Sequence, residues 1–227
     1  MKHVTLRAAF LDTLPVMTGY LFLGFGFGIL MQQNGMGIAW ALTLSLFVYA
    51  GSMQYVAVGL LTGGASLLTT ALTTLAVNAR HLFYGLSMID AYKDTGRKKP
   101  YLIFALTDET YSLVAGKVIP PEISRPRYYF LVSALNQFYW VLGTALGSLM
   151  GSLLPLNYEG IDFALTALFV TIFTGQWLQT KNHRPAIIGI GASILCLIIF
   201  GSSAFLIPAM GLIALLLLLT REKGAKQ

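Results

Sequence analysis

Long apolar runs, separated by short polar segments, fill this chain from one end to the other. We count eight apolar blocks, and most of them approach the roughly 20 residues that a helix needs to cross a bilayer. The pattern therefore predicts a protein built from membrane-embedded helices. The blocks cover residues 8–31, 38–61, 67–89, 100–118, 128–153, 161–179, 185–200 and 203–220.

The block at 67–89 is long enough to span a bilayer, yet it carries Asn78, Arg80 and His81 well inside it. An arginine near the centre of such a helix costs at least about 2.5 kcal/mol, so it is retained where it faces protein, a cavity or a counter-charge. We therefore predict that these three residues bind substrate. The alternative is a helix that begins later, near Thr73, so that Arg80 snorkels or only holds two helices together.

The block at 38–61 is interrupted by the segment AGSMQ at residues 50–54, near the depth of the bilayer centre. Irregular backbone is tolerated at that depth where it lines a cavity or is buried in protein, as in the broken helices of transporters. Gly51, Ser52 and Gln54 are therefore candidate substrate-binding residues. An unbroken helix that uses Gly51 and Ser52 as a packing notch is the alternative.

The short block at 100–118 has the segment TDET at residues 107–110 in its middle. Two adjacent carboxylates cannot both ionise cheaply in a low-dielectric setting unless a cation compensates them. We therefore predict that Asp108 and Glu109 couple transport to protons, and that one of them pairs with Arg80. The alternative is that Thr107 and Asp108 simply form the N-cap of a helix.

Composition agrees with a membrane protein, since charged residues make up only 11% of the chain and hydrophobic residues 56%. The mean hydropathy is +0.71. The fold class we predict is an all-α polytopic membrane protein with six to eight transmembrane helices and two interrupted or re-entrant segments, in a single domain over residues 1–227. Small residues recur in the first and fifth blocks, which indicates a possible inverted repeat.

The positions of the basic clusters can be explained by two membrane topologies. Cytoplasmic loops carry an excess of Lys and Arg, but eight simple spans would place the basic loop at residues 93–99 outside the cell. If the blocks at 38–61 and 100–118 instead dip into the membrane and return, every basic loop becomes cytoplasmic and six full spans remain. Eight spans with one wrongly placed loop stay possible.

The sequence contains no HExxH, GxSxG, P-loop or paired CxxC motif, so we predict that the protein is not an enzyme. The formal charge of +6 comes from short clusters beside apolar blocks and does not indicate nucleic acid. Cys196 is the only cysteine, and His3, His81 and His183 are scattered, so we expect neither a metal site nor a cofactor.

Five segments together resemble the azaleucine-resistance (AzlC-like) permease family. They are the glycine-rich first block with Pro15, then FVYAGSMQ, LTTLAVNARHLFYG, ALTDETYSL and DFALTALFVTIF. The resemblance covers nearly the whole chain. It implies the large subunit of a branched-chain amino acid exporter in the bacterial inner membrane, a secondary transporter that works with a small hydrophobic AzlD-like membrane subunit.

The residues agree with such a substrate. A zwitterionic amino acid needs a cation or a helix N-terminus for its carboxylate, an acceptor for its ammonium and an apolar pocket for its side chain. Arg80 or the backbone near Gly51 and Ser52 could bind the carboxylate, and Asp108 or Glu109 the ammonium. Aromatic residues that could form the pocket wall are Phe47, Tyr55 and Tyr84. A channel or a non-transporting scaffold subunit is the alternative function.

Overall fold

The structure, a computed structural model, describes residues 2–153, 163, 166–167, 170, 173–174, 177–178 and 180–220. These residues form helices joined by short connections, and no strand occurs among them, so the prediction of an all-α fold is confirmed. The chain divides into two compact units: Met1–Thr70 with Val77–Leu165, and Ala71–Ala76 with Thr166–Gln227. That all 227 residues act as a single domain stays a prediction.

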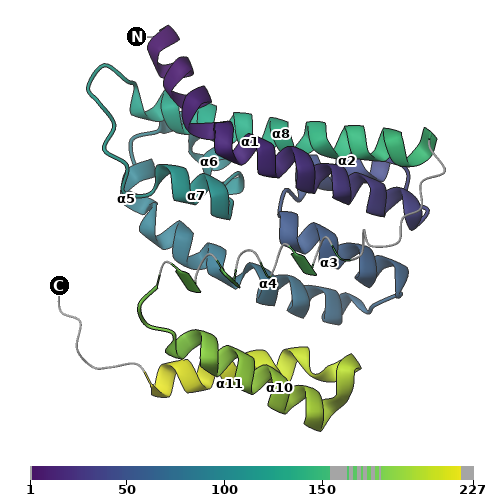
Figure 1. The fold of residues 1–227 in the computed structure, drawn as a ribbon. Coiled ribbons are helices and arrows are strands. Elements are labelled where there is room, and N and C mark those ends of the chain that lie inside the picture. The colour runs from purple at the N-terminus through teal and green to yellow at the C-terminus, as the bar shows by residue number, and fades with distance from the viewer. Residues whose placement is uncertain are drawn as a thin grey trace. The chain divides into compact units, whose positions relative to one another are not determined.

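Two long helices, α1 (Lys2–Gln33) and α8 (Arg125–Leu153), lie side by side and form the main helix pair of the first unit (Figure 1). Glycines allow this close approach: a Cβ on Gly28 would collide with backbone atoms of Thr144 and Ser148, and one on Gly147 with the backbone of Phe25. Contacts advance in step along the two helices, from Leu21 with Gly143 to Ile29 with Gly151, so they run in the same direction.

The block at 38–61 forms a hairpin of two short helices, α2 (Ile38–Phe47) and α3 (Gly51–Thr62). The helix breaks at residues 48–50, where Tyr49 has a positive φ of 44°, so the alternative of an unbroken helix is wrong. Gln54 Nε2 donates to Ser45 Oγ at 3.1 Å, although nine residues separate the two. Because nine residues of a continuous helix would extend about 13 Å, this bond shows that the chain folds back.

A second hairpin is formed by α6 (Lys99–Phe104) and α7 (Asp108–Val114), which are separated by a break at residues 105–107. Both ends of this hairpin lie near the first turns of α8. Lys98 Nζ lies 5.7 Å from the ring centroid of Phe130, and Lys117 Nζ lies 5.2 Å from that of Tyr128. The two interrupted segments predicted from the sequence are therefore present, and each returns towards the end from which it started.

In the chain order, the two hairpins are separated by α4 (Leu67–Ser87), the helix that carries Asn78, Arg80 and His81. Ser66 caps its N-terminus by accepting from the backbone N–H of Thr69 at 3.1 Å, so the alternative start near Thr73 is wrong. Two short elements, α5 (Ile89–Tyr92) and η1 (Gly96–Lys98), then lead through the basic loop to the second hairpin.

In the second unit, α10 (Arg184–Ala204) and α11 (Leu206–Leu219) pack against each other (Figure 1). Gly201 interrupts the regular helical conformation of α10 with φ 71° and ψ 172°, a region that favours glycine. Cys196 is buried and free. The predicted span at 161–179 lies largely outside the described residues, so the number of transmembrane helices stays a prediction.

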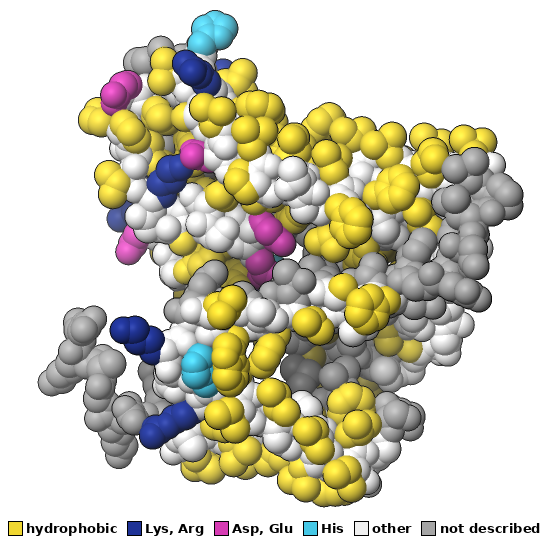
Figure 2. Space-filling view, in the orientation of Figure 1, with side chains coloured by type: hydrophobic (Ala, Val, Ile, Leu, Met, Phe, Trp, Pro, Cys, Tyr) yellow, Lys and Arg dark blue, Asp and Glu magenta, His cyan; other side chains and the backbone are white. Residues whose placement is uncertain are grey.

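Hydrophobic side chains are spread widely over the face shown in Figure 2, and charged side chains are far fewer there. Leu67, Phe47 and Ile198 are among the large apolar side chains that the fold leaves exposed. Within the described part of the chain, two helical segments are both long and apolar enough to cross a membrane, His3–Gln33 and Arg184–Gly201. Polar residues such as Arg80 and Asn136 lower the hydropathy of the other long helices.

Candidate functional site

The broken tips of the two hairpins meet inside the first unit. The ring centroids of Tyr49, in the first break, and Phe104, at the end of α6, lie 6.2 Å apart. Trp140 of α8 closes this region, since its indole carbons lie 3.1–3.6 Å from the position that a Cβ on Gly51 would take. Tyr20 of α1 packs edge-on against the same indole, with centroids 5.4 Å apart.

Arg80 joins the two tips. Its Nη2 donates to Ser52 Oγ at the start of α3 and forms an ion pair with Asp108 Oδ2 at the start of α7, both at 2.8 Å. The sequence predicted an acidic partner for Arg80, and the structure identifies it as Asp108. Arg80 Nε and Asp108 Oδ1 are buried without a hydrogen-bond partner in the structure, so the junction keeps one donor and one acceptor available for a ligand.

The side chains of Arg80 and Asp108 are each 27% exposed, so the pair is neither sealed in the core nor fully solvated. Both carboxylate and guanidinium can therefore exchange partners without first breaking the packing of the hairpins. A ligand with one carboxylate and one ammonium could bind in place of this pair, because each of its charges would match one member.

The predicted residues Gly51 and Gln54 help to build the junction from the other side. Gly51 allows the indole of Trp140 to pack on the first turn of α3, which has no side-chain cap. Gln54 is fully buried and donates to Ser45, while its Oε1 has no partner in the structure. Gln54 therefore lies in the helix interface behind Ser52.

Asn78 and His81 lie on α4 close to Arg80 in sequence, and both are half-buried. His81 Nδ1 lies 3.2 Å from the backbone oxygen of Asn78, and its ring contacts Tyr84 edge-on with centroids 5.6 Å apart. Neither residue forms a hydrogen bond or an ion pair with Ser52 or Asp108, so their predicted role in binding stays a prediction.

Glu109 has a different environment from its neighbour Asp108. Its Oε2 accepts a hydrogen bond from the hydroxyl of Tyr20 at 2.6 Å, and the same hydroxyl lies 2.7 Å from Thr107 Oγ1. Thr107 also caps α7 by accepting from the backbone N–H of Thr110 at 3.3 Å, so the cap and the break predicted for this segment coexist. The sequence did not indicate Tyr20, because a tyrosine in an apolar helix has no distinguishing pattern.

Of the aromatic residues expected to line a substrate pocket, only Tyr84 lies beside the junction. It stacks on Tyr111 of α7 with centroids 4.3 Å apart and an interplanar angle of 13°. Tyr55 is buried and donates to the backbone oxygen of Leu23, so it holds α3 against α1 instead. Phe47 is 76% exposed and points away from the core.

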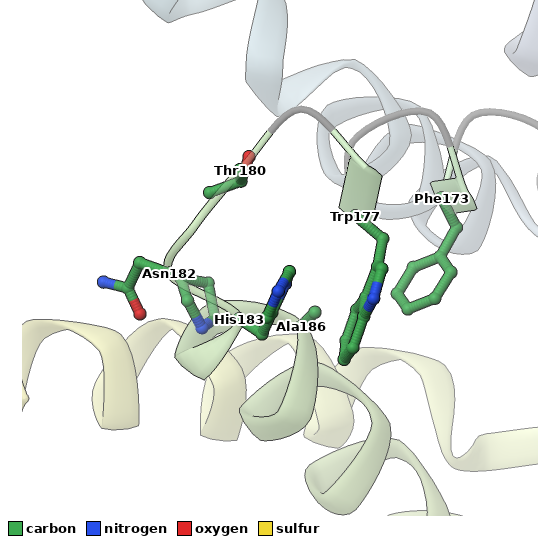
Figure 3. Close-up of a pocket in the computed structure, with 7 residues that line it drawn as sticks. Phe173, Trp177, Thr180, Asn182, His183 and Ala186 are labelled. Carbon is green, nitrogen blue, oxygen red and sulfur yellow. The ribbon is translucent and has the colours of Figure 1, made fainter.

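A separate pocket of about 260 Å³ lies within the second unit, and Figure 3 shows its aromatic and polar lining. Trp177 stacks on His183 with ring centroids 4.0 Å apart, and Asn182 and Thr180 also line the space. None of the residues predicted to bind substrate lines this pocket. Across the described residues, no group of three or more His, Cys, Asp or Glu side chains is arranged to hold a metal ion.

Broken helices that meet at a charged junction, in a chain with this exposed apolar surface, define an all-α membrane protein. Residues 15–154 match the family model described as AzlC protein. The chain is 44% identical over 204 residues to the branched-chain amino acid transport protein AzlC of Bacillus subtilis, covering 90% of this chain and 80% of the relative. The chain belongs to the AzlC family.

Other relatives carry membrane-protein names. An uncharacterized membrane protein of Helicobacter pylori is 41% identical over 97% of this chain and 98% of its own length. The inner membrane protein YgaZ of Escherichia coli is 27% identical over 78% of this chain and 73% of its own length. No solved structure matches the chain. The predicted location in a bacterial membrane is confirmed by these relatives.

Proposed function

We propose that this protein exports branched-chain amino acids across the inner membrane, and that substrate binds where Arg80 joins the tips of the two hairpins. The observation that carries the proposal is the double contact of Arg80 with Ser52 and Asp108. The 44% identity to the Bacillus subtilis transport protein supports the substrate class. The same relationship supports a transport role rather than an enzymatic one.

The charges at the junction match the two charges of an amino acid. Arg80 and the uncapped start of α3 at Gly51 would bind the substrate carboxylate, and Asp108 would bind the ammonium. In the free protein the two side chains neutralise each other. Substrate would replace one ion pair with two, which links binding to separation of the hairpin tips. The stacked rings of Tyr84 and Tyr111 would contact the apolar side chain.

Flux measurements test this proposal. Liposomes carrying the full chain together with its second subunit are loaded with labelled leucine, and its release is measured with and without a pH gradient. We expect Arg80→Gln to reduce release at least about tenfold, since a lost charge-assisted bond is worth more than 1.4 kcal/mol. Arg97→Gln, which removes an exposed cation from the basic loop, is the matched control and should release leucine normally.

Three results would contradict the proposal. Normal release by Arg80→Gln would remove the junction from substrate binding. No release by the unmodified protein would favour a scaffold subunit, and release that is indifferent to both the gradient and competing amino acids would favour a channel. Proton coupling at the adjacent carboxylates Asp108 and Glu109, by one of them or both, is part of the proposal, because they lie at the first turn of α7 beside the junction.

The proposal includes a partner, a small hydrophobic membrane subunit of the AzlD-like type. Family resemblance suggests it. The break at residues 105–107 is already buried within this chain, whereas Val48 in the first break is 43% exposed, and irregular backbone at membrane depth needs protein cover. We expect the chain alone, reconstituted as a verified monomer, to export leucine far more slowly than the two subunits together. Equal rates would show that the partner is not required.

A further inference from the structure

The adjacent carboxylates Asp108 and Glu109 have different partners, and this difference divides their roles. Asp108 pairs with the guanidinium of Arg80 at 2.8 Å. Glu109 accepts from the phenol of Tyr20 at 2.6 Å, and no ion pair to Glu109 occurs among the residues that the structure describes. One carboxylate therefore has a permanent charge as its partner, and the other has a neutral hydroxyl.

The hydroxyl of Tyr20 continues into a chain of hydrogen bonds. It lies 2.7 Å from Thr107 Oγ1, which lies 3.1 Å from Thr110 Oγ1, and Asn136 Nδ2 of α8 donates to Thr110 Oγ1 at 3.0 Å. All four of these side chains are buried, and Tyr20 is only 4% exposed. We call Tyr20, Thr107, Glu109, Thr110 and Asn136 the Tyr20 network.

The directions of these bonds show how the network can take up a proton on Glu109. With Glu109 ionised, Tyr20 donates to it and Thr107 donates to Thr110 Oγ1, so the 2.7 Å contact between Tyr20 and Thr107 carries no proton. When Glu109 is protonated, its own proton can bond to the Tyr20 hydroxyl, which then donates to Thr107 Oγ1, while Thr107 still donates to Thr110.

Glu109 therefore has a hydrogen-bond partner in both of its states, which lowers the cost of burying either one. Asp108 lacks this freedom, because a protonated Asp108 would leave the Arg80 guanidinium without its counter-charge, and a guanidinium does not give up its own proton. We propose that Glu109 alone carries the coupling proton, that Tyr20 is its positioning residue, and that Asp108 serves as the ion-pair partner of Arg80. This inference rests on the proposed transport function.

Other titratable groups face Glu109 from several elements. Arg80 and Tyr84 of α4 act on it through their charge or dipole, as does Tyr49 from the first break. Because Arg80 and Asp108 largely neutralise each other, the hydrogen bond from Tyr20 is the contact to Glu109 that a single substitution can remove cleanly.

Infrared spectroscopy tests the assignment without measuring transport. The full chain in lipid is titrated with acid, and the carbonyl band of a buried protonated carboxyl group is followed. Glu109→Gln should abolish the band and Asp108→Asn should retain it. Tyr20→Phe should move its midpoint up by about one pH unit, because the lost hydrogen bond stabilised the ionised form. Tyr92→Phe, which removes a buried hydroxyl without a partner, is the matched control.

Loss of the band in Asp108→Asn but not in Glu109→Gln would overturn the proposal, as would an unchanged midpoint in Tyr20→Phe. Absence of the band in the unmodified protein would also overturn it. Should Tyr20→Phe fail to fold, the isosteric change Glu109→Gln still decides which carboxylate holds the proton. Leucine exchange at equal pH, measured on the same preparation, reports the proposed function separately, so the two ideas can fail independently.

Discussion

Arg80 is tolerated inside an apolar helix because the fold brings it a counter-charge and a hydroxyl. Both partners come from the first turns of helices that begin at breaks, Ser52 on α3 and Asp108 on α7. Neither partner would be available if the hairpins were continuous helices. The breaks thus supply the partners that neutralise the buried charge of Arg80. In turn, the bonds of Arg80 to Ser52 and Asp108 hold the tips of the two hairpins together.

This dependence predicts a coupled pair. Removing one member of a buried ion pair costs about 3–5 kcal/mol, and about 1–3 kcal/mol is the expected cost here because both side chains are partly exposed. Arg80→Ala and Asp108→Asn should each lower thermal stability in detergent, and the double variant should be less damaged than the sum. The measurement is a double-mutant cycle on melting temperature.

Glu109→Gln supplies the comparison for that cycle, because Glu109 accepts a hydrogen bond from Tyr20 whereas the ion pair of Arg80 is with Asp108. Its effect should add to that of Arg80→Ala. The selective pairing would be disproved if the melting-temperature losses of Arg80→Ala and Asp108→Asn were strictly additive. It would also be disproved if Arg80→Ala showed the same coupling to Glu109→Gln as to Asp108→Asn.

The sequence could predict the charged residues of the site and could not predict their neutral partners. Arg80 and Asp108 stand out because ionisable residues are costly in apolar blocks, so their presence alone indicates a function. Tyr20 and Trp140 do not stand out, since aromatic residues are common in membrane helices for packing alone. The choice between Asp108 and Glu109 also needed the structure, because adjacent residues project about 100° apart on a helix and either could face Arg80.

Among the elements, both breaks follow from local sequence, whereas the pairing of α1 with α8 does not. Glycine, serine and a capping threonine are weak helix formers that mark residues 50–54 and 107–110. Each break lies just before its marked segment, at residues 48–50 and 105–107, and Gly51 to Gln54 form the first turn of α3 instead of irregular backbone. Small residues such as the glycines of α1 and α8 favour a close approach of two helices but do not specify which helix faces them. In the structure the two sets of glycines face each other.

This packing predicts that even one added methyl group at Gly28 is harmful. An alanine there meets backbone atoms of α8, which cannot move as a side chain can, so Gly28→Ala should lower stability by about 3 kcal/mol. Gly85→Ala on α4 is the matched control, because a Cβ there meets nothing within 4 Å and alanine is the better helix former. Thermal unfolding in detergent would measure both, and equal behaviour would refute the close contact.

For the whole first unit, the hairpins predict a definite membrane topology. The N-terminal part of α1 contacts the base of the second hairpin through Asp12 and Lys117, which form an ion pair at 2.5 Å. The basic loop at residues 93–99 leads into the same base. Since positive loops are retained in the cytoplasm, this end of the unit is predicted to be cytoplasmic and the loop at residues 63–66 periplasmic.

Cysteine labelling distinguishes this topology from eight simple spans, which would exchange the sides of the two loops. In a Cys196→Ala background, Ala65→Cys should react with an impermeant maleimide added to intact spheroplasts, because the first hairpin returns to the periplasmic side. Arg97→Cys, in an exposed position of the basic loop, should react only after the membrane is opened. The reverse pattern would mean that both interrupted segments cross the membrane, and the meeting of their tips at Arg80 would then be wrong.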